Sequence, residues 1–162
     1  YIAHALNLPL YQISSQLKTL AREKDISREG LIEFSRMLTQ QYGDGYLAEC
    51  IVNNAMSDNL LIAGMRQIGQ IEYLRTHCDL TLIGIYANPA LRFQRIAMRK
   101  KPGDPVTLEE FIRIEKREDG ESVQRVSDCM KQVDIMISNE SSLEDFHLRL
   151  AVVTKKIGNM LH

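Results

Sequence analysis

One stretch decides the fold: Leu60-Leu-Ile-Ala-Gly-Met-Arg66. Its first four residues are apolar, which predicts a short strand covered on both faces, because such a strand shows no polar alternation. Gly64 permits a tight turn that brings the backbone close to a ligand. Arg66 then follows the carboxyl end of the strand, where its planar guanidinium group can bind a phosphate through two hydrogen bonds. A surface arginine after a tight turn is the other interpretation.

Three further apolar runs predict strands, and helical spacing fills the segments between them. The expected strands, besides Leu60–Gly64, are about Leu8–Ile13, Leu80–Ala87 and Val133–Ser138. Strands that alternate with helices predict an α/β fold with a mostly parallel sheet. Ligands of such sheets bind beyond the carboxyl ends of the strands, so we expect the functional residues there.

Residues that cap helix ends predict the helix boundaries. The first residues, Tyr1–Leu6, have the pattern of a helix end. The later helices are expected from Ser14 or Ser15 to about Lys24, from Ser27 to the turn Gly43-Asp44-Gly45, from this turn to about Met56, over about Gln70–Thr76, Ala90–Lys100, Thr107–Asp119 and Ser122–Gln132, and from Ser142 onward.

Composition limits the classes of function. The chain has 162 residues, of which 44% are hydrophobic, enough for a single domain over residues 1–162. A formal net charge of −1 argues against a dedicated nucleic-acid binder. No apolar run approaches the roughly 20 residues that span a bilayer, so no membrane partner is expected. The three cysteines (Cys50, Cys78 and Cys129) predict neither a disulfide framework nor a zinc site, which favours a cytoplasmic location.

Four segments in one order resemble a known family. Leu60–Arg75 resembles the strand–Asp-Gly-x-Arg–helix segment of nucleoside-monophosphate kinases, and is closer to a group of small P-loop nucleotide kinases related to adenylate kinase and dephospho-CoA kinase. Leu31–Leu47 is similar to the group's helix that ends in a Tyr-Gly-Asp turn, Arg92–Arg99 to its lid-entry helix, and Val133–Asn139 to its last strand. The resemblance covers nearly the whole chain. It implies a three-layer αβα fold with a small helical lid.

The resemblance also implies roles for individual residues. It makes residues 14–56 the acceptor-binding region and residues 90–121 the lid. The ligands would be a small-molecule nucleotide, with ATP and Mg²⁺ as cofactors. The implied residues are Arg66, Gly64, Gln70 and Arg36 for the acceptor, Asn139 and Arg92 for the nucleotide, and Arg95 and Arg99 as catalytic lid cations.

The basic helix at Ala90–Lys100 has two interpretations, a lid over the nucleotides or a surface helix held by ion pairs. Arg92, Arg95 and Arg99 are spaced by three and four residues, so they share one helix face. Cations on a lid that closes over nucleotides would stabilise the charge of a transferring phosphoryl group. Glu109, Glu110, Glu115 and Glu118 lie close in sequence, however, and a surface helix pair held by ion pairs would have the same pattern.

Two features depart from the family. The phosphate loop Gly-x-x-x-x-Gly-Lys-Ser/Thr does not occur, so we expect the native protein to carry this loop and its central strand upstream of Tyr1. Ala63 stands where the family usually has an acidic residue that helps to hold Mg²⁺, so no metal ligand is assigned.

The leading hypothesis from the sequence is an ATP-dependent phosphotransferase of the nucleoside- or deoxynucleoside-monophosphate kinase type. One alternative is a nucleotide-binding or interaction module without catalysis that keeps the kinase fold. A further alternative is an enzyme similar to dephospho-CoA kinase. The sequence leaves the acceptor nucleotide and the oligomeric state open.

Overall fold

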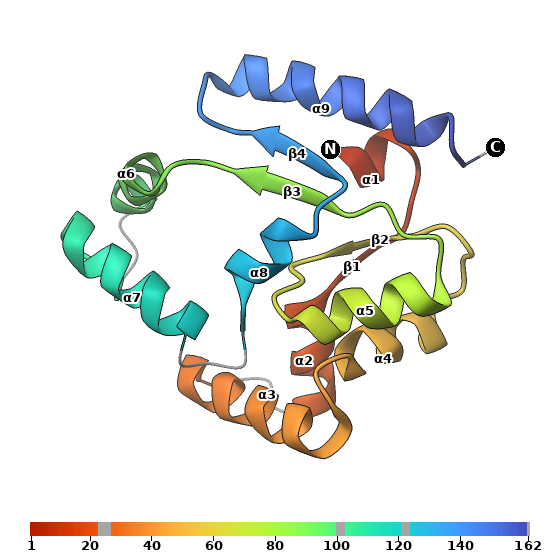
Figure 1. Ribbon diagram of the computed structural model, residues 1–162, viewed down its shortest axis with the longest axis horizontal. Helices are drawn as coiled ribbons and strands as arrows, with labels where there is room; N and C mark the ends of the chain where they lie inside the picture. Colours follow the sequence, from red (N-terminus) through yellow and green to blue (C-terminus); the bar gives the residue numbers. More distant parts are fainter. Residues whose placement is uncertain (23–26, 100–102, 121–123, 162) are drawn as a thin grey trace.

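The computed structural model describes residues 1–22, 27–99, 103–120 and 124–161 (Figure 1). The helices are α1 (Ile2–Ala5), α2 (Ile13–Ala21), α3 (Arg28–Tyr42), α4 (Tyr46–Asn54), α5 (Ile68–His77), α6 (Pro89–Arg99), α7 (Leu108–Gly120), α8 (Val126–Lys131) and α9 (Leu143–Gly158). The strands are β1 (Leu10–Gln12), β2 (Leu61–Ala63), β3 (Ile83–Tyr86) and β4 (Ile135–Ser138). The expected helix boundaries at Lys24, Lys100 and Ser122 lie outside the described residues.

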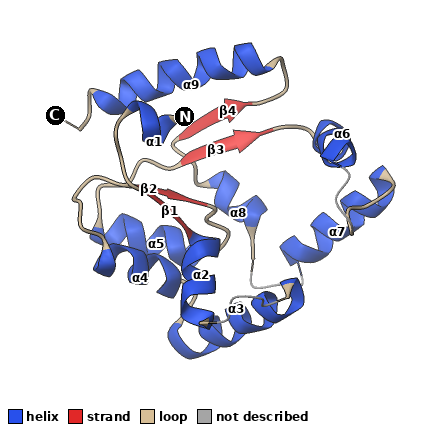
Figure 2. Cartoon of the chain, turned by 180° about the vertical axis from the view of Figure 1, so that it is seen from behind, coloured by secondary structure: helices blue, strands red, loops and turns tan. Residues whose placement is uncertain are grey.

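Both strand pairings are parallel, as the alternation of strands and helices predicts. β1 pairs with β2, with Leu10 opposite Leu61, and β3 pairs with β4, with Ile83 opposite Ile135. Over the described residues these pairs form two separate two-stranded sheets rather than one sheet. In Figures 1 and 2 the pair β3–β4 lies above the pair β1–β2, with β2 and β3 on the facing sides. The fold is therefore mixed α/β with parallel strands.

Three of the expected helix caps are present. The hydroxyl oxygens of Ser27, Thr107 and Ser142 accept hydrogen bonds from main-chain N–H groups three residues on, at 3.0, 3.1 and 3.1 Å. The prediction of a cap at Ser14 or Ser15 is wrong, because β1 passes directly into α2 at Ile13 and leaves no loop for a cap residue.

Two apolar clusters form the core, and Met65 packs against both. The first lies between α2, α3 and α4 and has Ile13, Leu38, Leu47 and Ile51 at its centre. The second joins α5 to α8 through Ile71, Leu82 and Cys129. Since Met65 follows the turn at Gly64, the segment between β2 and α5 connects the two halves of the molecule.

The turn between α3 and α4 docks on the beginning of α5. The carboxylate of Asp44 accepts the main-chain N–H of Gly69 at 2.9 Å, a favourable place for a negative charge at a helix N-terminus. A Cβ atom at Gly69 would collide with this carboxylate, and one at Gly45 would lie 2.9 Å from the carbonyl oxygen of Gly69. Gly45 is therefore needed for α4 to approach the backbone of α5 this closely, and Gly69 for the Asp44 carboxylate to reach its N–H.

Gly69→Ala tests this contact. The new methyl group must displace Asp44, so we expect the free energy of unfolding to fall by about 2 kcal/mol. Gly120→Ala is the matched control, because a Cβ atom there meets open space. Urea denaturation of both variants measures the difference, and equal midpoints for the two would contradict the close approach.

Asp134 connects β4 to α5 and to the start of β3. Its carboxylate accepts the main-chain N–H of Leu82 at 2.7 Å and a hydrogen bond from Arg75 at 3.1 Å. These contacts lower the pKa of Asp134, the bond from Leu82 most strongly and the guanidinium of Arg75 next among the lowering effects.

A lowered pKa makes the contribution of Asp134 depend on pH. Its stabilisation is present above the unfolded-state pKa of about 4 and is lost as the pH falls through the folded-state value. We expect Asp134→Asn to lower Tm by about 2–4 °C at pH 7, and the gap to the wild type to close below that pKa. Thermal melts from pH 7 to pH 3 measure it, with Asp58→Asn, an exposed aspartate before β2, as the control. A gap that does not change with pH would rule out the charge as its source.

Candidate functional site

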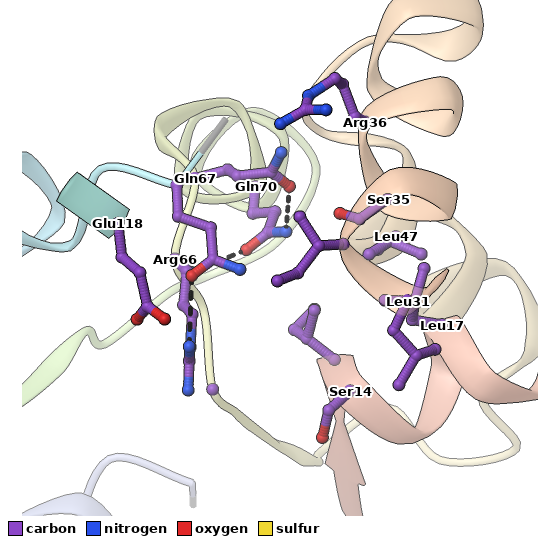
Figure 3. Close-up of a pocket in the computed structure, with 14 residues that line it drawn as sticks. Ser14, Leu17, Leu31, Ser35, Arg36, Leu47, Arg66, Gln67, Gln70 and Glu118 are labelled. Carbon is purple, nitrogen blue, oxygen red and sulfur yellow. Dashed lines mark hydrogen bonds between the residues drawn. The ribbon is translucent and has the colours of Figure 1, made fainter. Parts of the chain in front are cut away.

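A cavity of about 300 Å³ opens at the carboxyl ends of β1 and β2 (Figure 3). Its wall comes from α2, α3, α4, the segment from β2 into α5, and the end of α7. The lining residues are Ile13, Ser14, Leu17, Leu31, Ile32, Ser35, Arg36, Leu47, Gly64, Arg66, Gln67, Gln70, Glu118 and Gln124. The wall thus combines apolar side chains with two arginines, which suits a ligand that has an apolar body and an anionic group.

The turn after β2 brings the backbone to this cavity. Gly64 has φ of 83°, a conformation that side-chain-bearing residues rarely adopt. A Cβ atom there would meet nothing within 4 Å, so the glycine is needed for its conformation and not for space. Gly64 therefore has the backbone role expected from the sequence, next to Ala63 at the end of β2.

Arg66 is held at three points. Its main-chain N–H donates to Gln70 Oε1 at 3.0 Å, and its carbonyl oxygen accepts the N–H of Arg125 at 2.7 Å. Its guanidinium Nη1 donates to Gln124 Oε1 at 3.2 Å. The backbone is fixed on both sides, while the exposed guanidinium has a neutral and exchangeable partner in this bond.

Arg36 reaches the cavity from α3. Its Nη1 forms an ion pair with Glu33 at 2.6 Å, one helical turn away. The two side chains are 42% and 72% exposed, so this pair contributes little stability and can exchange with a ligand. Arg36 and Arg66 therefore put two guanidinium groups on one cavity, and Glu118 from α7 lines the same wall.

Gln70 also lines the cavity, but its amide is already engaged. Its Oε1 accepts from Arg66, and its Nε2 donates to Gln67 Oε1 at 2.7 Å. Gln67 in turn donates to the hydroxyl of Thr39 on α3 at 2.9 Å. Gln67 and Gln70 are 3% and 1% exposed, so this chain of hydrogen bonds lies under the cavity wall.

A second group of expected residues lies outside this cavity lining. Arg95 on α6 donates to the carbonyl oxygen of Asn139 at 2.9 Å, and the N–H of Asn139 donates to the carbonyl oxygen of Tyr86 at 2.7 Å. The structure therefore brings Arg95 and Asn139 together at the carboxyl ends of β3 and β4.

The other two cations of α6 are paired. Arg92 donates to Glu115 on α7 at 2.6 Å and stacks over the ring of Phe111. Burial raises the pKa of Glu115, although the charge of Arg92 acts in the opposite direction. Arg99 donates two hydrogen bonds to Asp104, at 2.9 and 2.8 Å. The interpretation of a helix pair held by ion pairs thus describes Arg92, while Arg99 pairs with Asp104 ahead of α7 and Arg95 contacts a loop carbonyl.

Four polar residues of the cavity lining were not predicted from the sequence as site residues: Ser35, Gln67, Glu118 and Gln124. Gln67 carried a usable signal, since it precedes Gln70 by three residues at a helix start. Gln124 carried none, because its contact with Arg66 spans 58 residues of chain.

Within the described residues, no group of three or more His, Cys, Asp or Glu side chains is placed to hold a metal ion. Over the same part of the chain, no helix is both long enough and apolar enough to cross a membrane.

The fold and the site define an α/β protein with a cationic cavity at the carboxyl ends of parallel strands. No protein-family model matches the chain. A UPF0200 protein of Hyperthermus butylicus is 30% identical over 150 residues, which cover 90% of this chain and 79% of that protein. UPF0200 proteins of Staphylothermus marinus and Methanocaldococcus jannaschii are 27% and 26% identical, over 96% and 99% of this chain and 82% and 83% of their own lengths. The chain belongs to the UPF0200 family.

Proposed function

We propose that this protein is an ATP-dependent phosphotransferase of the nucleoside- or deoxynucleoside-monophosphate kinase type, acting on a small-molecule nucleotide in the cytoplasm. The observation that carries the proposal is the position of Arg66. Its guanidinium group follows a strand end and a glycine turn, and it lines a cavity with Arg36. Two guanidinium groups in the lining of a cavity that also has apolar side chains suit a phosphate joined to a nucleoside.

The proposed architecture is the three-layer αβα fold of P-loop nucleotide kinases. The two parallel pairs β1–β2 and β3–β4 support it, because one further parallel strand between β2 and β3 would join them into a single sheet. The carboxyl ends of all four strands would then lie at one edge, where ligands of such sheets bind.

In this proposal α6 and α7 form the lid, and the chain itself supplies cations. Arg95 lies beside the loop at Asn139, where it can bind a phosphate oxygen of the second nucleotide once it leaves the loop carbonyl. Arg99 can also bind a phosphate oxygen once it leaves Asp104. Such positioning of charge is the main contribution of protein side chains to phosphoryl transfer. ATP would supply the transferred phosphoryl group.

The described residues do not fit Mg²⁺. Ala63 has no oxygen ligand, at the place where the resemblance leads one to expect a carboxylate. We therefore derive no step through the metal. Ala63 favours the second candidate function, a nucleotide-binding module without catalysis. The resemblance to dephospho-CoA kinase is a further alternative for the acceptor.

Arg66→Ala tests the acceptor site. Loss of a charge-assisted contact with phosphate should raise Kd for the cognate nucleoside monophosphate by about tenfold or more. Arg75→Ala is the control, because it removes the same charge from α5 outside the cavity lining. Calorimetry with a panel of ribo- and deoxyribonucleoside monophosphates measures Kd, and a coupled assay with ATP measures turnover. Binding without turnover would support the non-catalytic module, and no binding by the wild type would refute the acceptor site.

Arg95→Glu tests the lid. The reversed charge repels nucleotide phosphates, so we expect Kd for ATP to rise at least tenfold while Tm changes by less than about 2 °C, as usual for an exposed side chain. Fluorescence titration with an ATP analogue and a thermal melt measure the two effects. Equal ATP affinity in the wild type and the variant would remove Arg95 from the site.

A further inference from the structure

A chain of hydrogen bonds, buried at the link between Gln67 and Gln70 and half-buried at its other links, runs from α3 to the backbone of Arg66. It starts at the carbonyl oxygen of Ser35, which accepts from Thr39 Oγ1 at 3.0 Å. Gln67 Nε2 donates to Thr39 Oγ1, Gln70 Nε2 donates to Gln67 Oε1, and Arg66 N–H donates to Gln70 Oε1, at 2.9, 2.7 and 3.0 Å. The dashed lines of Figure 3 mark the part between Gln67 and Arg66.

The two ends of this chain fix its direction. The main-chain N–H of Arg66 can only donate, so Gln70 must present its oxygen there and its amide nitrogen to Gln67. At the other end the carbonyl of Ser35 can only accept, so the single proton of the Thr39 hydroxyl points to it and the hydroxyl oxygen accepts from Gln67. Flipping one amide would bring two acceptors together at one link and two donors together at the next. The Arg66 N–H at one end and the Ser35 carbonyl at the other therefore both require the orientation in which the Thr39 hydroxyl accepts from Gln67.

We propose that Thr39 is a positioning residue for Arg66: through Gln67 and Gln70 it holds the backbone from which the guanidinium group reaches the acceptor phosphate. This inference rests on the proposed function, in which the cavity binds a nucleoside monophosphate. It also joins the two cations, because Thr39 and Arg36 lie one turn apart on α3. The wall that carries Arg36 and the turn that carries Arg66 are thereby held in one arrangement.

Removing the Thr39 hydroxyl should free the backbone of Arg66 without leaving a cavity in the protein. In Thr39→Val the side chain keeps its shape, but Gln67 Nε2 loses its acceptor in a place that is almost closed to water. The amide must turn to find another partner, which breaks the links to Gln70 and then to Arg66. Thr39→Ser keeps the hydroxyl and should restore the chain. Thr39→Ala removes the hydroxyl with a smaller, strongly helix-forming side chain and serves if the valine variant does not fold.

The chain offers a matched control. Thr76 on α5 makes the same bond to its own helix as Thr39 does, from Oγ1 to the carbonyl oxygen of Glu72 at 2.8 Å. It is exposed and does not line the cavity. Thr76→Val therefore reproduces the local helix effect of the substitution and leaves the glutamine chain intact.

The experiment compares ligands with and without phosphate, on the full chain. Calorimetry measures Kd for a panel of ribo- and deoxyribonucleoside 5′-monophosphates and for the matching free nucleosides. In Thr39→Val we expect Kd of the monophosphate that the wild type binds to rise about tenfold, the change that one lost hydrogen bond produces. Kd of its nucleoside should change less than about twofold, since the nucleoside makes no contact through the phosphate. Thr39→Ser and Thr76→Val should match the wild type.

A second readout needs no ligand. Hydrogen exchange of the Arg66 main-chain amide, followed by NMR, should become faster in Thr39→Val and return to the wild-type rate in Thr39→Ser. An equal loss of affinity for monophosphate and nucleoside, or no loss for either, would overturn the positioning role. If the wild type binds no monophosphate, the proposed function fails, and the exchange rate alone decides the role of Thr39: an unchanged rate in Thr39→Val overturns it.

Discussion

The approach of α4 to α5 is the constraint on which the rest of the structure depends. The carboxylate of Asp44 binds the N–H of Gly69 where neither Gly69 nor Gly45 leaves room for a side chain. This contact sets α3 and α4 against the start of α5. Because α3 carries Arg36 and the segment before α5 carries Arg66, the distance between the two cations follows from it. The cavity is thus a result of backbone packing before any ligand is considered.

The candidate arginines lie in two parts of the fold, the cavity and α6, and their guanidinium groups differ in their hydrogen-bond partners. Around the cavity, the backbone of Arg66 is bonded on both sides, while its guanidinium has a neutral partner in Gln124. On α6, the guanidinium groups of Arg92 and Arg99 are tied to carboxylates. A phosphate that binds Arg66 would exchange a neutral partner, whereas one that binds Arg36, Arg92 or Arg99 would have to displace a carboxylate.

Membership of the UPF0200 family and the proposed chemistry are separate conclusions. The first follows from the similarity over nine tenths of the chain to the protein of Hyperthermus butylicus. The second depends on the geometry of Arg36, Arg66 and Gly64. Ala63 separates phosphate binding from catalysis. The cavity needs no carboxylate at this position to bind a phosphate, but metal-assisted phosphoryl transfer would need one.

The sequence by itself determined the features that depend on residues close together in the chain. The strand within Leu60–Gly64, the turn at Gly64 and the caps at Ser27, Thr107 and Ser142 each depend on a few neighbouring residues, and all were predicted. The resemblance grouped Gly64, Arg66, Gln70 and Arg36 as acceptor residues, and all four line one cavity. Only the tertiary structure decided how the four strands divide into two sheets, that Gln70 is bonded within the protein, and that Gln67 and Gln124 reach Arg66 and its neighbours. These contacts join residues as far as 58 positions apart, and no short-range pattern encodes which partners a folded backbone brings within hydrogen-bond distance.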